Sequence, residues 1–408
     1  MQVYIGIDWS EENHTLVFMN EAGVDLARLS IAHTLDGFTQ FDTLRRKFGL
    51  ATSDCLVGLE TAHNIFIDYL WSQGYVHLYV LPPSLVKANQ SRFRQSGAKD
   101  DPADARLIAE ILRTDRGRLQ PWKPDALLTR QMQADLSLIL HLNRQAIRLS
   151  NRLRSVLLRY YPAVLKVFKS GLTTQIAPEF VRAYPSPQAA KELSLDKFIA
   201  FGRKHHYPKP GLLPHCFARL QADYPQASPD SVLIYQEQAV QLADLLLHTT
   251  HQKRKTQARL LARYRQHPNY AIFHSLPGTG KFIGPALLAK FGDDPQRFPK
   301  AASVQALAGT SPVTEQSGKY KIVRFRRACD KEWRYISQEW AMALVTKTQH
   351  PLAVAYFQKI RPHCHSDSHA FRCVANRWIA VSWKVWFSQT VYDEAYHFQQ
   401  QAARSKPR

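Results

Sequence analysis

The sequence predicts a mixed α/β region at its N-terminal end, long paired helices in the middle and a mainly α-helical C-terminal region. Short β-type runs alternate with helical patterns over residues 1–120, which is typical of a layered α/β domain. Apolar residues then repeat at spacings of three and four, which predicts coiled-coil helices over residues 121–266. We expect a third domain over 267–395 and a basic tail, 396–408, without ordered structure.

The N-terminal elements can be read in order from their apolar patterns. Three strands are expected in "QVYIGID", "HTLVFMN" and "ARLSIAH", the last two joined by the turn-like "NEAGVD". A helix in "LDGFTQFDTLRRKFG" follows, then a strand ending at Glu60, a helix around "NIFIDYLWSQG", a strand in "VHLYVL" and a helix from Asp101. This order matches the plan of ribonuclease H-like domains, although order by itself shows only a layered α/β domain.

Four carboxylates in the first quarter of the chain stand where buried elements begin or end. They are Asp8, Glu60, Asp101 and Asp104. The first two end apolar β-type runs, and the last two are three residues apart on one face of a predicted helix. Oxygen ligands suit Mg²⁺, with Mn²⁺ as a substitute, and such ions assist phosphodiester chemistry. The sequence therefore predicts a metal-dependent site for reactions at phosphate.

Part of this set has a simpler explanation. Acids are favoured at a helix N-terminus, so Asp101 and Asp104 are equally well explained as capping residues. Asp8 is harder to explain in that way, because an ionised group that ends an apolar strand is costly unless it is paired or coordinated. Asp100 is an alternative ligand to Asp101, and the K-x-D-x-x-D-A pattern favours Asp101.

The charge balance indicates what the phosphate belongs to. The chain has 408 residues, with 54 Lys and Arg against 33 Asp and Glu, and a formal net charge of +21. Such an excess, spread along predicted helices, attracts nucleic acid. Five scattered cysteines favour a reducing compartment, and no apolar run is long enough to cross a membrane. We expect a cytoplasmic protein that binds nucleic acid and no membrane.

The first long helical pattern runs from Leu127 to Tyr160 and carries a heptad seam. Its apolar positions are Ile139, Leu142, Ala146, Leu149, Leu153 and Val156. Arg144, Arg148 and Arg152 form a stripe beside the seam, with no acid between them. Because a solvated coiled-coil flank normally mixes charge signs, we favour contact with a phosphate backbone over a merely solvated face.

The second long pattern covers residues 231 to about 266 and ends in an acid-free basic stretch. That stretch includes Lys253, Arg254 and Lys255, which we also expect to contact nucleic acid. Nine prolines lie between residues 161 and 230 and exclude one continuous coiled coil. We expect an inserted subdomain of short helices there.

The Gly-rich segment "LPGTGKFIG" opens the C-terminal region and is similar to a Walker A loop. Ser275 replaces the leading Gly of that pattern, and Phe282 stands where Ser or Thr should hold Mg²⁺, which argues against nucleotide hydrolysis. We favour a turn between two helices in which Gly278 and Gly280 let backbone N–H groups approach a DNA phosphate. An ordinary connection between helices explains the same residues.

The segment "ALAGTSPVTEQSGKYKIVRFRRACD" contains a candidate nucleophile, Ser317. Its neighbours are small or basic: Gly318, Lys319, Arg324, Arg326 and Arg327. A polar loop gives access, and cations stabilise the charge that develops in phosphoryl transfer. Serines before glycine are usually turn formers, which is the simpler explanation. Ser311 is a second serine in this segment, and the S-G-K context favours Ser317.

The run "HCHSDSHAFRC" is a possible zinc-binding segment. Its candidate ligands are His363, Cys364, His365, His369 and Cys373. A closed zinc site needs four well-placed ligands, and the run contains no paired C-x-x-C half-site. The residues by themselves therefore argue against a zinc site.

Seven segments in this order carry a resemblance to a known family. They are "GIDWS", "GLETA", "KDDPADA", "LPGTG", "FGDDPQRF", "ALAGTSPVTEQSGK" and "HAFRCVANRWIAVSWKVW...VYDEAY". Together they resemble the transposases of the IS-one-ten insertion-sequence family, also called bridge-RNA-guided recombinases. The resemblance covers residues 1–120 and roughly 265–395, with the connecting helices between them.

The resemblance implies a RuvC-like DEDD domain, a coiled coil for assembly and a transposase domain with a catalytic serine. Carried onto this chain, it makes Asp8, Glu60, Asp101 and Asp104 the metal-binding acids and Ser317 the nucleophile. In the family the serine attacks the DNA backbone and forms a 5'-phosphoserine intermediate, while a structured RNA pairs with donor and target DNA. It also implies a bacterial or archaeal protein associated with the nucleoid.

Three functions remain open from the sequence. The first is a DNA recombinase with a serine nucleophile, acting as a coiled-coil dimer or tetramer in which the acids and Ser317 form composite sites. The second is a metal-dependent nuclease or Holliday-junction resolvase in which water attacks. The third is a non-catalytic scaffold that binds RNA or DNA, whose acids have only structural duties.

Overall fold

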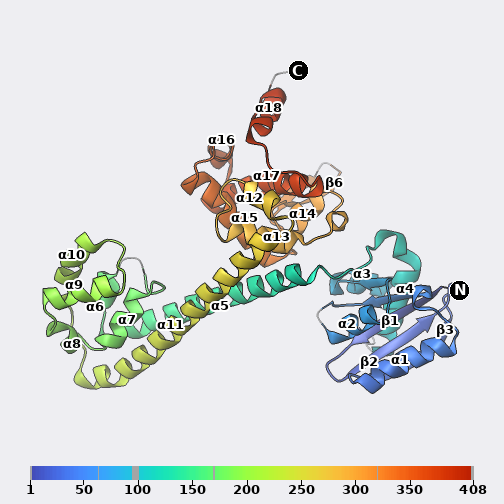
Figure 1. Ribbon diagram of the computed structural model, residues 1–408, viewed down its shortest axis with the longest axis horizontal. Coiled ribbons are helices and arrows are strands. Elements are labelled where there is room, and N and C mark those ends of the chain that lie inside the picture. The colour runs from blue at the N-terminus through green and yellow to red at the C-terminus, as the bar shows by residue number, and fades with distance from the viewer. Residues whose placement is uncertain (1, 63, 94–100, 169–170, 319, 406–408) are drawn as a thin grey trace. The chain divides into compact units, whose positions relative to one another are not determined.

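The computed structural model describes residues 2–62, 64–93, 101–168, 171–318 and 320–405 (Figure 1). The chain divides into two compact units, Met1–Pro124 and Asp125–Arg408. The first is a mixed α/β unit, and the second is mostly helical, as the sequence predicts. None of the described helices combines the length and apolarity needed to cross a membrane.

The first unit is built on a five-stranded sheet in the order β3-β2-β1-β4-β5. Its strands are β1 (Val3–Trp9), β2 (Asn13–Met19), β3 (Asp25–Ala32), β4 (Cys55–Leu59) and β5 (Leu78–Val80). The first three pair antiparallel as a meander, while β4 pairs parallel with both β1 and β5. The sequence places all five strands, because each carries a compact apolar run.

Alternate residues of the sheet face two different layers of helices. Ile5, Phe18 and Val57 pack with α1 (Leu35–Lys47) and α2 (Ile65–Ser72). Tyr4 and Leu56 point the other way and pack with α3 (Pro83–Phe93) and α4 (Asp101–Asp115). A 3-10 turn, η1 (Thr52–Asp54), leads into β4, and η2 (Arg116–Arg118) follows α4. Period-two alternation thus buries both faces of the sheet.

The second unit contains two long helices that lie side by side, α5 (Leu127–Tyr160) and α11 (Pro229–Gln266) (Figure 1). Residues of the predicted seam, such as Ala146 and Leu153, are buried together with Ala243 and Leu246 of α11. The apolar seam is therefore covered by a helix of the same chain, so the seam alone does not require a second chain.

Short helices fill the segment between α5 and α11. They are α6 (Ala163–Val167), α7 (Ile176–Ala183), α8 (Pro187–Lys191), α9 (Leu195–Lys204), η3 (Pro210–Leu212) and α10 (Leu213–Leu220). Phe180 and Phe198 are buried at their centre. Prolines at the first turns of α8 and α10 suit this arrangement, because proline is compatible with a helix start but not with a helix interior.

The remainder of the second unit is a helical core with one β-hairpin. Its elements are α12 (Tyr270–Ser275), α13 (Ile283–Phe291), η4 (Pro295–Arg297), α14 (Ala301–Leu307), β6 (Val313–Ser317), β7 (Tyr320–Arg324), α15 (Lys331–Met342), the π-helical turn η5 (Ala343–Lys347), α16 (Pro351–Ile360), η6 (Arg361–His363), α17 (Asp367–Phe387) and α18 (Glu394–Ser405). Trp333, Trp340 and Trp386 are buried in the core, which also includes Met132 of α5 and Leu260 of α11. The expectation of an unstructured tail from residue 396 is wrong, because α18 extends to Ser405.

The segment "FGDDPQRF" anchors the start of α5. The Asp293 carboxylate accepts hydrogen bonds from the Ala126 N–H (2.6 Å) and the Thr129 hydroxyl (2.6 Å). Asp125 forms an ion pair with Arg297 at 2.9 Å. Asp293 therefore satisfies a donor at the N-terminus of α5, where acceptors are needed.

Candidate active site

The parallel register of β1 and β4 brings two of the predicted acids together. Gly6 is opposite Gly58, and Ile7 is opposite Leu59. Asp8 and Glu60 are the next residues along these two strands, so they are neighbours at the carboxyl edge of the sheet. Asp8 is two residues after Gly6, and Glu60 is two residues after Gly58. Because side chains two apart on a strand point to the same face, both acids lie on the face covered by α4.

Close contact between the sheet and α4 adds a third acid to this edge. A Cβ atom on Gly6 would lie 1.9 Å from the carbonyl oxygen of Ala105, and one on Gly58 would lie 2.7 Å from Ile108 Cγ2. The α4 backbone therefore lies directly against β1. Asp104 immediately precedes Ala105 and is only 8% exposed. This burial distinguishes Asp104 from an ordinary capping acid, which faces solvent.

The acids offer a donor set made only of oxygen atoms. Asp101 is the first residue of α4, but its side chain and the whole of Asp100 fall outside the described residues. Asp8, Glu60 and Asp104 could hold Mg²⁺ or Mn²⁺, since hard cations prefer carboxylates and offset the repulsion between clustered negative charges.

Ser317 lies at the tip of the hairpin in the second unit. It is the last residue of β6 and pairs with Tyr320, the first residue of β7. Gly318 has a positive φ of 56°, which two-residue hairpin turns require. Apart from its chain neighbours, no described residue has an atom within 4 Å of a Cβ placed on Gly318. Ser317 is exposed, and Lys319 falls outside the described residues. The hydroxyl is therefore placed where a large substrate can reach it.

The basic residues after Ser317 have different roles. Arg326 donates to the backbone carbonyls of Ser311 (3.2 Å) and Pro312 (3.3 Å), so it fixes the base of the hairpin. Arg324 forms an exposed ion pair with Glu315 at 3.0 Å. Arg327 is exposed. Sequence reasoning treated these cations as equivalent, because it could not see which of them the hairpin itself uses.

Ser311 occupies a different environment from Ser317. It is half-buried at the base of the hairpin and lines a cavity of about 510 Å³ between the hairpin and the start of α17. Arg324, Arg326 and Arg372 line the same cavity. The structure thus separates the two candidate serines, one at an open tip and one in a cationic cavity.

The Gly-rich segment forms the turn between α12 and α13. Gly278 and Gly280 have positive φ values of 69° and 51°. A Cβ on Gly278 would lie 3.0 Å from Thr348 Oγ1. Gly280 is exposed, and in the described part of the chain only its own neighbours could lie within 4 Å of a Cβ there. Gly278 is therefore needed for packing within the unit, and Gly280 leaves open space for an approaching ligand.

The basic residues of the long helices fall into two groups, those that are exposed and those that bind partners within the chain. Arg148, Arg152 and Lys255 are exposed. The other predicted contacts have partners in the chain: Arg144 pairs with Glu332 at 3.2 Å, Lys253 donates to Asn143 at 3.2 Å and Arg254 donates to Gln175 at 2.8 Å. Asp135, only 2% exposed, accepts from both Arg259 and Arg263. These partners are far apart in sequence, so helical spacing could not predict them.

Three side chains that could serve as metal ligands gather at the start of α17. Ligand atoms of Cys364, His369 and Cys373 all lie within 4.8 Å of one another. Burial, followed by the neighbouring Cys364, raises the pKa of the Cys373 thiol. The signal in the sequence was the one-turn spacing of His369 and Cys373, and the fold supplies Cys364 from the preceding loop.

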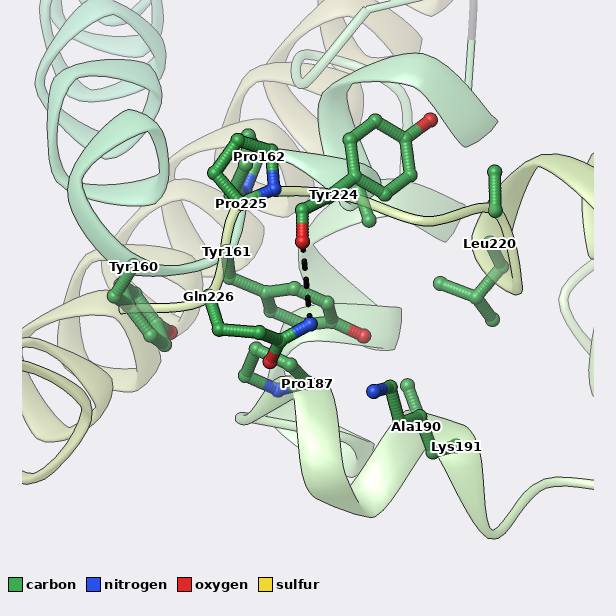
Figure 2. A pocket seen from close by; sticks show the side chains of 12 residues that line it. Tyr160, Tyr161, Pro162, Pro187, Ala190, Lys191, Leu220, Tyr224, Pro225 and Gln226 are labelled. Carbon is green, nitrogen blue, oxygen red and sulfur yellow. Dashed lines mark hydrogen bonds between the residues drawn. The ribbon is translucent and has the colours of Figure 1, made fainter. Parts of the chain in front are cut away.

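A second cavity lies among the short helices and is shown in Figure 2. Its volume is about 20 Å³, enough for a water molecule and far too small for a nucleotide. Tyr161 lines it, and the buried Tyr161 hydroxyl has no hydrogen-bond partner among the described residues. We interpret this cavity as a hydration site for that hydroxyl and not as a substrate pocket.

Comparisons with known proteins identify the class of the chain. A family model for DEDD transposases of the IS110 type, described as "Transposase", matches residues 5–162, and a model of the "Transposase IS116/IS110/IS902 family" matches residues 270–358. The first match contains all four acids, and the second contains Ser317. The two matches define the chain as a transposase.

Curated relatives agree with this class. The "Mini-circle putative transposase for IS117" of Streptomyces coelicolor is 26% identical over 93% of this chain and 92% of its own length. The "Insertion element IS900 uncharacterized 42 kDa protein" of Mycobacterium paratuberculosis is 25% identical over 81% of this chain and 82% of its own length. The chain belongs to the IS-one-ten family of insertion-sequence transposases, written IS110 in the family descriptions.

Proposed function

We propose that this transposase cuts and rejoins DNA through a 5'-phosphoserine intermediate on Ser317, with carboxylate-bound Mg²⁺ assisting. The observation that carries the proposal is the position of Ser317 at an open hairpin tip, within the segment matched by the transposase family model. A nucleophile for a DNA backbone must be accessible to a large polyanion, and the exposed tip meets that condition.

The proposed reaction conserves the number of phosphodiester bonds. The Ser317 hydroxyl loses its proton to solvent as its oxygen bonds to the phosphorus, and the bond from phosphorus to the 3' oxygen breaks. The departing 3' oxygen takes up a proton and becomes a hydroxyl. The 3' hydroxyl of the other DNA then attacks the phosphoserine, which releases Ser317 and rejoins the strands. Because the intermediate stores the bond energy, the reaction needs no nucleotide hydrolysis.

The acids have a supporting role in this proposal. Asp8, Glu60 and Asp104, together with Asp101 from the start of α4, would hold Mg²⁺ at the carboxyl edge of a RuvC-like sheet. The bound ion would neutralise phosphate charge and help to align the scissile phosphate. The acids belong to the first unit and Ser317 to the second, so the proposal requires the units to act on one phosphate, within a chain or between subunits.

We also propose that a structured bridge RNA guides the enzyme and that it works as a homo-oligomer. The net charge of +21 and the exposed Arg148 and Arg152 support binding of nucleic acid through its phosphates. The open space at Gly280 supports a phosphate contact at the α12–α13 turn. Exposed apolar residues on the long helices, including Leu158 (61% exposed) and Leu233 (66%), support a subunit interface there.

A covalent trap tests the nucleophile. Incubating the full chain with donor DNA and its guide RNA should yield a protein-DNA adduct that survives denaturation. The adduct should be absent for Ser317→Ala and present for Ser311→Ala. An adduct that persists in Ser317→Ala would show that the nucleophile is another residue. Hydrolysed ends without any adduct would favour the metal-dependent nuclease.

A plasmid recombination assay tests the acids. Asp8→Asn and Glu60→Gln should abolish recombination while the chain still binds DNA. Unchanged recombination in both variants would instead favour a structural role for the acids, as in a non-catalytic scaffold.

A further inference from the structure

We propose that Cys364, His369 and Cys373 hold a divalent transition-metal ion, with zinc as the preferred ion. None of these three residues belongs to the acids of the first unit, and none is Ser317. Two thiolates and one imidazole are the donors that zinc and similar borderline-soft ions select, in contrast to the carboxylates proposed for Mg²⁺.

The spacing of the three ligand atoms fits such an ion. They lie within 4.8 Å of one another. In a tetrahedral site with Zn–S bonds of about 2.3 Å, two sulfur atoms are about 3.8 Å apart. Rotation of the side chains can close the remaining gap, because His369 and Cys373 lie one turn apart on α17 and Cys364 faces them from the adjoining loop.

The surroundings hold these ligands in place. Arg361 donates to the backbone carbonyl of Cys364 at 3.1 Å and also pairs with Asp367. Ser366 caps α17 by accepting from the His369 N–H at 3.2 Å. The His365 ring stacks on the His369 ring, with their centroids 5.9 Å apart. The hydrogen bonds fix the backbone on which the three ligands stand, and the ring contact restricts the His369 side chain.

One coordination position would remain open toward the cavity below the hairpin. His369 and Cys373 line that cavity, as do Arg326 and Arg372. Three protein ligands with a fourth, open position are the pattern of zinc sites that accept water or an anion. The Arg372 and Arg334 guanidiniums lie over the Phe325 ring, 4.6 and 4.7 Å from its centroid. Phe325 directly follows β7, so the proposed site adjoins the base of the hairpin that carries Ser317.

Metal analysis of the full chain tests the proposal. The protein, purified without chelators and without a histidine tag, should contain about one zinc per chain. Cobalt added to the metal-free protein should give a thiolate-to-cobalt charge-transfer band. Cys373→Ser and His369→Ala should lower zinc affinity roughly tenfold or more. The matched controls Cys329→Ser and His363→Ala should retain it.

A protection experiment on the unmodified chain gives a result even where a variant does not fold. Zinc should slow alkylation of Cys364 and Cys373, read by mass spectrometry, and leave that of Cys329 unchanged. A chain that binds no zinc, gives no thiolate band or shows equal protection of Cys329 would overturn the proposal.

Discussion

The acid edge of the first unit and the serine hairpin of the second are built in opposite ways. Asp8, Glu60 and Asp104 are positioned by a sheet register and by a helix in backbone contact with β1. Ser317 stands on a two-stranded hairpin, and among the described residues none beyond the neighbours of Gly318 comes within 4 Å of a Cβ placed there. The acids are therefore coupled to the stability of their unit, and Ser317 is not. Substitutions that disturb the acid edge should therefore lower both activity and stability, whereas a substitution of Ser317 should lower activity alone.

The largest effect is expected at the hairpin tip. Ser317→Ala should reduce recombination by at least about a thousandfold, because removal of a nucleophile leaves only binding and electrostatic contributions. The melting temperature should stay the same, since exposed positions without packing partners change stability by about 0.5 kcal/mol or less. Activity and thermal unfolding of the purified variant check this. A Ser317→Ala chain that is strongly destabilised would show that the tip is packed after all.

The next effect is expected where α4 meets the sheet. Gly6→Ala should destabilise the first unit by about 3 kcal/mol or more, because its Cβ would overlap the Ala105 carbonyl oxygen. Gly117→Ala is the matched control, since nothing lies within 4 Å of a Cβ there. Urea unfolding, followed by hydrogen exchange of β1 peptides, measures both. Equal stability of the two variants would contradict the close contact on which the position of Asp104 depends.

The stability of the first unit should also depend on pH through His14. Burial, followed by the charge of His33, lowers the pKa of His14 from 6.5 to about 4. Between pH 6.5 and 4 the unfolded chain binds a proton at His14 that the folded unit excludes. The free energy of unfolding of the first unit should therefore decrease by up to about 3 kcal/mol as the pH is lowered through this range.

Hydrogen exchange of β2 peptides at pH 7 and pH 5, corrected for intrinsic rates, checks this pH dependence. His14→Phe keeps a ring against Phe66, whose centroid lies 5.2 Å away, and should remove the dependence. The Ser317 hairpin should show no matching change.

The smallest effect is expected on the long helices. Arg148→Ala and Arg152→Ala should each weaken DNA binding a few-fold and reduce the slope of log affinity against log salt by about 0.9. Arg259→Ala should leave that slope unchanged, because its guanidinium is bound to Asp135. Binding measured over a range of salt concentrations distinguishes the two groups. If Arg259→Ala reduced the salt-dependence slope by the same amount, the ion pair with Asp135 would not prevent Arg259 from contacting DNA phosphate.

The strands of the sheet could be predicted from the sequence. The way in which the helices pack on the sheet could be predicted only in part. Asp8 lies one residue before the end of β1 and Glu60 directly follows β4. Because neighbouring parallel strands end at one edge of a sheet, the proximity of these acids follows from local patterns. The contact of α4 with Gly6 and Gly58 could not be foreseen, because a glycine in a strand does not reveal which backbone approaches it. The heptad seam of α5 was evident, whereas its partner, α11 of the same chain, depends on how the intervening residues fold.

The remaining differences come from contacts between distant residues. Asp135 neutralises Arg259 and Arg263 from 124 and 128 residues away, so the basic stretch of α11 overstates the charge available to DNA. Cys364 reaches His369 and Cys373 only because η6 and the cap of α17 turn the chain back. Residue patterns at helical or strand spacing predict local elements only, so they cannot predict contacts between distant parts of the sequence.

The central claim is that the acids and Ser317 act on the same phosphodiester bond. The most direct test is the yield of the covalent adduct in Asp8→Asn, compared with the unmodified chain under equal DNA binding. We predict that the adduct will be lost in Asp8→Asn, as we also expect for Ser317→Ala, and that both variants will still bind DNA. A full yield of adduct in Asp8→Asn would contradict the account, since it would show that Ser317 attacks DNA without help from the acid edge.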